Sequence, residues 1–451
     1  MKQSKTSATL FIAMVAMTIA LMAVAAWIER GFGSVEVSRI QVPILTNDGI
    51  QTYLTAKLYV PGTASKDSPA PAVLALHGYQ NDKDTSAAYA LELARRGIVT
   101  LSLDQFGHGE TPLGLRHRGF DTAKGGPDRF KLFMSFSAMN RDGIAGIIDS
   151  SMGASAAFRW LARLDYVDPA RIGLTGHSMG TWSALTAAME NPSHAAVVLQ
   201  CGEVEGPVLG TDGQPTIRNM LLLQARYDEF DYFRDYKLTV GGLNTTELRY
   251  KTFAGQDSPI DWNATYGDFA EGTARRMQLL ETVHRGVTHS PAGMAVAMDW
   301  FVSSLGVNTA LDSGDQVFMV RELLLGLALL IAVLSLLPLL DILLATRFFA
   351  SAACAMPSRF VAPKKGRRRS VIGSVLLGGL LYPFVTQLGH GLFPYPKDIF
   401  RTLMAGGLIL WLCTLALVSL FQLSRWYRKG EGRQAGVTLY DLGLSFDMHK
   451  T

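Results

Sequence analysis

Residues 171–190 read RIGLTGHSMGTWSALTAAME, and this stretch decides the fold. Its first five residues are typical of a short buried strand, and the residues from Ser178 to Glu190 have the spacing of a helix. Gly176 and Gly180 stand on either side of Ser178, and small residues there permit a sharp turn that lifts the serine hydroxyl above the strand end. The stretch therefore predicts a strand, a tight turn and a helix, with Ser178 at the carboxyl edge of a sheet.

Short apolar runs alternate with helical stretches on both sides of this turn. The further expected strands are 72–76, 98–103, 195–199 and 220–224, and the expected helices are 86–96, 144–164 and 291–305. Apolar strands separated by helices predict a parallel sheet covered on both faces. Residues 35–45 and 52–60 alternate around Asn47-Asp48-Gly49, which predicts an antiparallel hairpin at the sheet edge. The fold class is therefore α/β, with a mostly parallel sheet.

Two long segments of this region, 105–142 and 229–280, are polar, contain Gly and Pro, and show little periodicity. Connections of this length in a compact domain are usually lids or binding loops. We therefore interpret both segments as inserted loops of a domain that extends over residues 31–310.

An acid is expected downstream of the serine. A neutral serine hydroxyl is a poor nucleophile and needs a base, which is itself oriented by an acid. Asp228 follows the expected strand 220–224 and is the predicted acid. Glu229 and Asp231 are neighbouring alternatives.

Two histidines are candidates for the base, His284 and His289. The base is expected in a loop between the last strand and the closing helix. Residues 291–305 are predicted to form that helix because Pro291 stands at its start, where proline is tolerated. His289 lies directly before it and is therefore favoured over His284.

Nucleophilic attack on a carbonyl also requires backbone N–H groups directed at the developing negative charge. The N–H of Met179, directly after the serine, is one predicted donor. The second is expected in the loop after the strand 72–76, where we predict the N–H of Tyr79.

Five features in their order along the chain resemble the α/β-hydrolase superfamily, within it the bacterial serine-esterase, dienelactone-hydrolase-like and serine-aminopeptidase-like group. These features are His77-Gly78-Tyr79, Asp104–Gly109, Gly176–Gly180, Asp228 and His289. The resemblance covers about three-fifths of the chain and implies a Ser-His-Asp hydrolase that forms an acyl-enzyme on Ser178. It implies His289 as base, Asp228 as orienting acid, and neither a metal nor an organic cofactor.

The sequence departs from the group at two points. Dienelactone hydrolases use a cysteine nucleophile, whereas position 178 is serine, and the His77-Gly78 loop lacks the Gly-Gly extension of many lipases. The resemblance assigns His108 to a structural turn, not to catalysis. The leading interpretation is a carboxylic ester hydrolase. A peptidase, amidase or acyltransferase with the same triad is an alternative, and a transport or signalling protein with a non-catalytic binding domain is an alternative of another class.

Four apolar runs are each long enough to cross a membrane. They span 10–28, 323–344, 371–389 and 403–423. A cleavable signal peptide is an alternative for the first run, because Ala23-Val24-Ala25 fits a small-x-small cleavage site. The first 30 residues are interpreted as an uncleaved signal-anchor, and residues 318–424 as three membrane helices.

Basic residues predict the orientation of these spans. Lys2 and Lys5 precede the first run, and Lys and Arg are abundant in 345–370 and in the tail 425–451. The positive-inside rule makes these parts cytoplasmic, and the 31–310 domain and the 390–402 loop extracytoplasmic. We therefore expect a multi-pass protein of the cell membrane, and the resemblance stated above implies a bacterial source.

The composition excludes several classes. The 451 residues are 48% hydrophobic and only 18% charged, which argues against disorder and for membrane segments. A net charge of +4 gives no support to nucleic-acid binding. Three cysteines are too few for a disulfide framework, and Cys201 is interpreted as a small buried residue. The expected partners are a small-molecule or lipid ester and membrane lipids, and the sequence leaves protein partners open.

Overall fold

The computed structural model describes residues 2–45, 49–112, 149, 151–202, 216–229, 239–350, 364–392 and 405–430. The chain divides into two compact units. One unit is Ala23–Leu324, and the other consists of Met1–Met22 and Leu325–Thr451.

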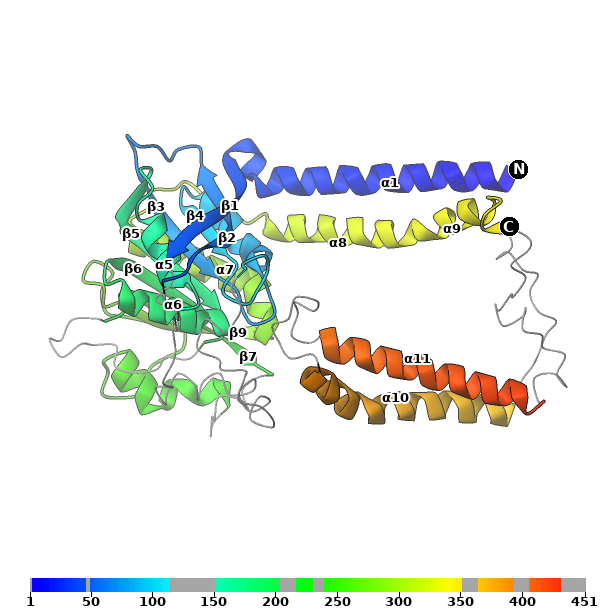
Figure 1. Ribbon diagram of the computed structural model, residues 1–451. Helices are drawn as coiled ribbons and strands as arrows, with labels where there is room; N and C mark the ends of the chain where they lie inside the picture. Colours follow the sequence, from blue (N-terminus) through cyan, green and yellow to red (C-terminus); the bar gives the residue numbers. More distant parts are fainter. Residues whose placement is uncertain are drawn as a thin grey trace. The chain divides into compact units, whose positions relative to one another are not determined.

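A mixed sheet organises the Ala23–Leu324 unit (Figure 1). Its strands are β1 (Val35–Leu45), β2 (Gln51–Pro61), β3 (Ala70–Leu76), β4 (Val99–Leu103), β5 (Val167–His177), β6 (His194–Gln200), β7 (Met220–Tyr227), β8 (Thr265–Tyr266) and β9 (Arg275–Val283). In the described part of the chain they pair in the order β1-β2-β4-β3-β5-β6-β7-β9-β8. The six strands from β4 to β9 along this order are parallel, whereas β1, β2 and β8 pair antiparallel. The predicted mostly parallel sheet with an antiparallel hairpin at one edge is therefore confirmed.

Helices follow the strands, as the alternating pattern predicts. They are α2 (Ala87–Arg95), α5 (Ala154–Leu161), α6 (Met179–Glu190) and α7 (Pro291–Leu305), with short 3-10 or π turns η1 (Gly31–Gly33), η2 (Lys83–Ser86), η5 (Val240–Thr245), η6 (Leu248–Phe253) and η7 (His284–His289). Helix α7 begins at Pro291. Proline has no backbone N–H, and none is needed in the first turn, where N–H groups have no partner within the helix. The side chain of Ser290 accepts a hydrogen bond from Gly293 N and caps the helix.

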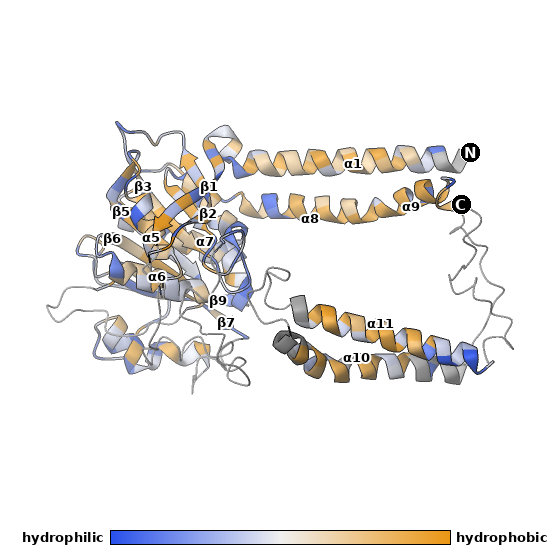
Figure 2. Ribbon diagram, in the orientation of Figure 1, coloured by the Kyte–Doolittle hydropathy of each residue, from blue (hydrophilic) through white to orange (hydrophobic). Residues whose placement is uncertain are grey.

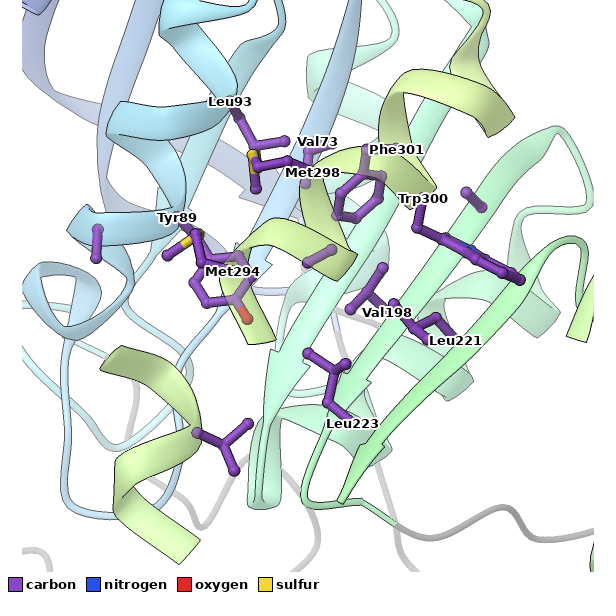
Figure 3. Packing of buried hydrophobic residues seen from close by; sticks show 14 of the residues in the cluster. Val73, Tyr89, Leu93, Val198, Leu221, Leu223, Met294, Met298, Trp300 and Phe301 are labelled. Atoms are coloured by element: carbon purple, nitrogen blue, oxygen red, sulfur yellow. The ribbon is translucent and has the colours of Figure 1, made fainter. Parts of the chain in front are cut away.

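The main core lies between the sheet and the helices α2 and α7 (Figure 3). Leu221 and Leu223 point from β7 into this layer, and Met298 and Phe301 enter the same layer from α7. Trp300 satisfies its indole N–H by donating to Asn219 O at 2.9 Å. Each such large apolar side chain stabilises the fold by roughly 1.5–3 kcal/mol relative to exposure, so this layer holds the strand ends in place.

Apolar helices make up the rest of the described chain (Figure 2). They are α1 (Lys2–Glu29), α8 (Phe318–Leu334), α9 (Leu336–Leu344), α10 (Lys364–Leu392) and α11 (Ala405–Arg428). Among the described residues, three stretches are long and apolar enough to cross a membrane: Lys5–Glu29, Phe318–Leu344 and Gly407–Arg428. The expected span 371–389 falls within α10, where the apolar part of the described residues, Val371–Thr386, is shorter.

Two polar side chains of these helices are hydrogen-bonded to a neighbouring helix. Asp341 in α9 accepts a hydrogen bond from Ser7 Oγ in α1 at 3.1 Å. Trp411 in α11 donates to Gly378 O in α10 at 3.1 Å. Such pairs satisfy groups that are expensive in a hydrocarbon environment.

An ion-pair cluster joins the ends of α1 and α8 to the sheet within the Ala23–Leu324 unit. Glu29, the last residue of α1, accepts hydrogen bonds from Lys57 Nζ at 2.7 Å and from Tyr59 Oη at 2.7 Å, both from β2. Arg321, in the first turn of α8, lies 3.2 Å from the same carboxylate. Within this unit, one carboxylate therefore connects the end of α1, the start of α8 and strand β2.

The structure corrects one interpretation and leaves parts of two others outside the described residues. Segment 229–280 is not a simple loop, because β8 and most of β9 lie in it. Strand β9 pairs with β7 over most of its length, so this segment completes the sheet. Most of 105–142 and Asn47-Asp48 of the hairpin turn lie outside the described residues.

Candidate active site

Ser178 occupies a strained turn between β5 and α6. Its φ of 53° and ψ of −116° lie in a region that non-glycine residues rarely adopt. Ser178 N donates to Gln200 O at 2.9 Å, so the turn is attached to the end of β6. The neighbours His177 and Met179 are buried, whereas Ser178 is partly exposed. The geometry is that of a nucleophile elbow, as the sequence predicts.

Glycines on either side of the serine make this elbow (Gly176–Gly180) sterically feasible. A Cβ at Gly180 would lie 2.6 Å from the carbonyl oxygens of Leu76 and His77 at the end of β3. A Cβ at Gly176 would lie 2.1 Å from Gly180 O. Side chains at these positions would collide with backbone, so α6 can begin this close to the sheet only with glycine.

Asp228 directly follows β7 and pairs with a histidine, as predicted. His284 Nδ1 lies 2.9 Å from Asp228 Oδ1 and 3.0 Å from Oδ2. Both side chains are buried, with 4% of Asp228 and 3% of His284 exposed. The alternative acid Glu229 accepts instead from His284 N at 2.8 Å, and the other alternative, Asp231, lies outside the described residues. A carboxylate on one ring nitrogen fixes the ring orientation and the tautomer.

This acid–base pair (Asp228 and His284) lies next to the elbow. The carbonyl oxygen of His284 is 3.1 Å from His177 Nε2, and the two imidazole rings are 4.9 Å apart between centroids. His177 directly precedes Ser178. No hydrogen bond of Ser178 Oγ occurs among the described residues, and in proteins without substrate such catalytic contacts are often longer than in the substrate complex.

The sequence-based choice of His289 as the partner of Asp228 is wrong. His289 Nδ1 pairs with Thr288 Oγ1 at 2.8 Å, and its ring faces Phe318 at 6.4 Å between centroids. The physical reason is that β9 ends at the residue before His284, so this histidine stands at the strand end beside Asp228. The signal in the sequence was the apolar content of MQLLETV, residues 277–283, which is typical of a strand.

The loop after β3 covers the elbow. A Cβ at Gly78 would lie 3.3 Å from Ser178 Cβ, which shows how closely this loop approaches the serine. Tyr79 follows Gly78, and Met179 follows Ser178, so both expected N–H donors belong to segments that meet at the elbow. Their role in binding an oxyanion stays a prediction.

The buried His77 connects this loop to Gln105 by hydrogen bonds. The sequence did not indicate these contacts. Gln105 N donates to His77 Nε2 at 3.2 Å, and His77 Nδ1 lies 2.7 Å from Gly78 O. Since Nε2 accepts, Nδ1 must carry the ring proton. Gln105 Nε2 also donates to His77 O at 2.6 Å. Burial, and secondly the neighbouring His108, lower the pKa of His77 to about 3, which keeps its ring neutral.

Asp104 stabilises the turn that contains His108 through hydrogen bonds. This buried carboxylate lies 2.8 Å from Lys83 Nζ and accepts from Thr55 Oγ1 at 2.7 Å and Glu110 N at 2.9 Å. Burial raises the pKa of Asp104, but these hydrogen bonds outweigh burial and lower it below its usual value. These contacts give Asp104 a structural role, which agrees with the structural role expected for this turn.

Three of the solved structures that are similar to this chain have names of hydrolases. A dienelactone hydrolase-like promiscuous phosphotriesterase from metagenomic libraries is 16% identical and covers 60% of this chain and 99% of its own, with a TM-score of 0.38. A cold-adapted esterase from an Arctic intertidal metagenomic library is 19% identical and covers 60% and 94%, with a TM-score of 0.37. The dienelactone hydrolase from Anabaena variabilis is 17% identical and covers 60% and 98%, with a TM-score of 0.35.

No protein-family model and no curated protein matches the chain. The fold assignment therefore rests on strand order and on the strand–elbow–helix geometry. Both are those of an α/β-hydrolase domain, so the resemblance inferred from the sequence is confirmed at the level of fold.

Proposed function

We propose that this protein is a membrane-anchored serine hydrolase that cleaves carboxylic esters through Ser178, His284 and Asp228. The observation that carries the proposal is the hydrogen bond of 2.9 Å between Asp228 and His284, beside the strained serine turn. Strain at a non-glycine residue persists only where the surrounding structure enforces it, and it occurs often at functional sites.

The chemistry follows from these groups. Ser178 Oγ attacks the ester carbonyl carbon while His284 takes the hydroxyl proton. Asp228 stabilises the imidazolium that forms. The negative charge on the carbonyl oxygen is received by the N–H groups of Tyr79 and Met179, worth about 10²–10³ in rate for each donor. His284 then gives its proton to the departing alcohol. In the second half of the reaction His284 takes a proton from a water, whose oxygen attacks the acyl carbon. The bond between this carbon and Ser178 Oγ breaks, the acid leaves, and His284 returns the proton to Ser178 Oγ.

We further propose that the hydrolase domain is extracytoplasmic. The apolar helix ending at Glu29 precedes the domain, and the apolar stretch Phe318–Leu344 follows it. Both can serve as anchors, and the basic residues before the first run and after Leu344 favour a cytoplasmic side for those ends. This arrangement presents the site to substrates outside the cytoplasm, including membrane lipids.

Labelling with a fluorophosphonate probe tests the nucleophile. We expect the full-length protein and Ser65→Ala, a change of an exposed serine in a turn, to be labelled, and Ser178→Ala to remain unlabelled. A well-folded wild-type protein that is not labelled after cell lysis would refute an activated serine. Hydrolysis of p-nitrophenyl esters of different acyl-chain lengths then tests the ester preference.

The orientation has its own test. A membrane-impermeant probe added to intact cells or spheroplasts should label Ser178 as fully as it does after lysis. Labelling that appears only after lysis would place the domain on the cytoplasmic side and contradict the proposed orientation, without affecting the proposed chemistry.

A further inference from the structure

A thiol lies against the acid–base pair, and the proposed hydrolytic reaction does not use it. The sulfur of Cys201, a carboxylate oxygen of Asp228 and a ring nitrogen of His284 all lie within 4.8 Å of one another. Cys201 is fully buried, and the other two side chains are nearly so. Within the described part of the chain, Cys201 is a thiol and not half of a disulfide.

The sheet brings these three residues together. Cys201 is the first residue after β6, Asp228 the first after β7, and His284 the first after β9. These strands are adjacent and parallel, so their carboxyl ends meet at one edge. Cys201 N donates to Leu223 O at 2.7 Å, which attaches the cysteine to the end of the neighbouring strand. The cluster is thus built on rigid strand ends, not on surface side chains.

We propose that Cys201, Asp228 and His284 form a binding site for a thiophilic divalent cation such as Zn²⁺, and that occupancy of this site inhibits the hydrolase. Thiolate, carboxylate and imidazole are the three side-chain ligand types that Zn²⁺ accepts, and three protein ligands leave a fourth position for water. The inhibition rests on the proposed function, whereas the binding of metal does not.

The distances suit such an ion after small movements. Zn–ligand bonds of about 2.0–2.3 Å in a tetrahedron place ligand atoms roughly 3–4 Å from one another. Asp228 and His284 are now 2.9 Å apart at their closest atoms, and the sulfur lies within 4.8 Å of both. Shifts of about 1 Å in side chains are therefore enough to enclose an ion.

A buried hydroxyl beside the thiol gives a second indication. Tyr89 is 1% exposed, and no hydrogen-bond partner for its Oη is present among the described residues. Tyr89 and Cys201 belong to one cluster of buried side chains, and a tyrosine hydroxyl is protonated at neutral pH. A protonated hydroxyl can donate to a metal-bound thiolate or water, as groups around metal ligands commonly do.

The proton balance explains the inhibition. Cys201 releases its thiol proton to solvent as the sulfur–metal bond forms. The Nδ1 atom of His284, which now faces Asp228, loses its proton to coordinate the ion, and the single proton of the neutral ring is then carried on Nε2. An imidazole held in this tautomer cannot accept the proton of Ser178. Metal binding and general-base catalysis therefore exclude each other.

Cadmium absorbance tests the site without reference to activity. The full-length protein in detergent, with its affinity tag removed, is titrated with Cd²⁺ while the ultraviolet charge-transfer band of the cadmium–thiolate bond is followed. We expect a band that saturates at one Cd²⁺ per chain, is lost in Cys201→Ser and is retained in Cys413→Ser, which removes an exposed cysteine. We expect His284→Ala to weaken Cd²⁺ binding at least about tenfold. A band of wild-type size in Cys201→Ser would refute the site.

Inhibition by Zn²⁺ tests the consequence. Each variant is compared with its own metal-free activity, and we expect Cys201→Ser to require at least about tenfold more Zn²⁺ for half inhibition than Cys413→Ser does. EDTA should restore activity in the inhibited protein. Equal Zn²⁺ sensitivity of the two variants contradicts the inhibition. A protein that binds Cd²⁺ through Cys201 but never hydrolyses an ester supports the metal site and overturns the proposed function.

Discussion

The elbow and the acid–base pair lie at the same edge of one sheet but are built in different ways. The elbow is a stretch of five consecutive residues whose φ of 53° at Ser178 is permitted by two flanking glycines. The pair joins Asp228 to His284, which are 56 positions apart in the chain. Its geometry depends on the register of β7 against β9 and on where β9 ends.

This difference determines what a mutation can reveal. A change in the elbow acts through backbone collisions, so it should affect stability and activity together. A change in the pair removes a side chain whose backbone is held by the sheet, so it should affect activity far more than stability. The following predictions examine that distinction, from the largest expected effect to the smallest.

Replacing His284 should have the largest effect. We expect His284→Ala to lower kcat/KM by roughly 10⁴–10⁶, because loss of one triad member removes most of the catalysis. His289→Ala should change kcat/KM less than about tenfold, since removing a partly buried hydrogen bond to Thr288 costs about 1 kcal/mol. Kinetics with a p-nitrophenyl ester measure both. A larger loss of kcat/KM in His289→Ala than in His284→Ala would show that His289 is the base.

Gly180→Ala should damage the elbow. The added Cβ would lie 2.6 Å from two backbone oxygens of β3, and such overpacking costs about 1–3 kcal/mol in the free energy of unfolding. A displacement of Ser178 by about 1 Å should also lower kcat about 10²-fold. Gly241→Ala is the matched control, because its Cβ would meet only the end of the Arg226 side chain at 3.4 Å. Thermal unfolding and esterase kinetics measure both effects. Equal unfolding temperatures and equal kcat values for the two variants would contradict the prediction.

Gln105→Leu should weaken the clamp on the loop that covers the elbow. It removes the bond of 2.6 Å to His77 O and leaves this buried oxygen without that donor, at a cost of about 1–3 kcal/mol. If Gln105 positions the oxyanion donors, kcat should fall about tenfold while KM changes little. A lower thermal stability with an unchanged kcat would show instead that Gln105 has only a structural role.

Acid should lower the stability of the fold through the same buried histidine. The pKa of His77 is lowered to about 3 in the folded state, mainly by burial, whereas the unfolded chain takes up this proton near pH 6.5. Between these values the unfolded state binds more protons, so stability falls as the pH decreases from about 6.5 towards 3. The pKa of His194 is also lowered, first by burial, and contributes with the same sign.

A variant can separate the two histidines. His77→Asn should show a shallower decline of the unfolding temperature with decreasing pH than the wild type, because one source of proton uptake is absent. Thermal melts of both proteins between pH 4 and 7 give the comparison. Parallel curves would mean that His77 does not contribute to the pH dependence.

The sequence by itself determined the features that depend on neighbouring residues. Gly176 and Gly180 around Ser178 predicted the elbow, and Pro291 predicted the start of α7. The apolar strands and long apolar helices followed from periodicity and length, since local backbone geometry fixes which residues share a face. Asp228 was predicted as the acid because it follows a strongly apolar strand.

Only the tertiary structure decided which histidine meets Asp228. The apolar residues 277–283 indicate a strand, but the sequence does not show that β9 pairs with β7 or where it ends. The end of β9 then places His284, and not His289, beside Asp228, and the end of β6 brings Cys201 to the same point. Contacts between residues far apart in the chain depend on strand register and on where each strand stops, and these are properties of the assembled sheet.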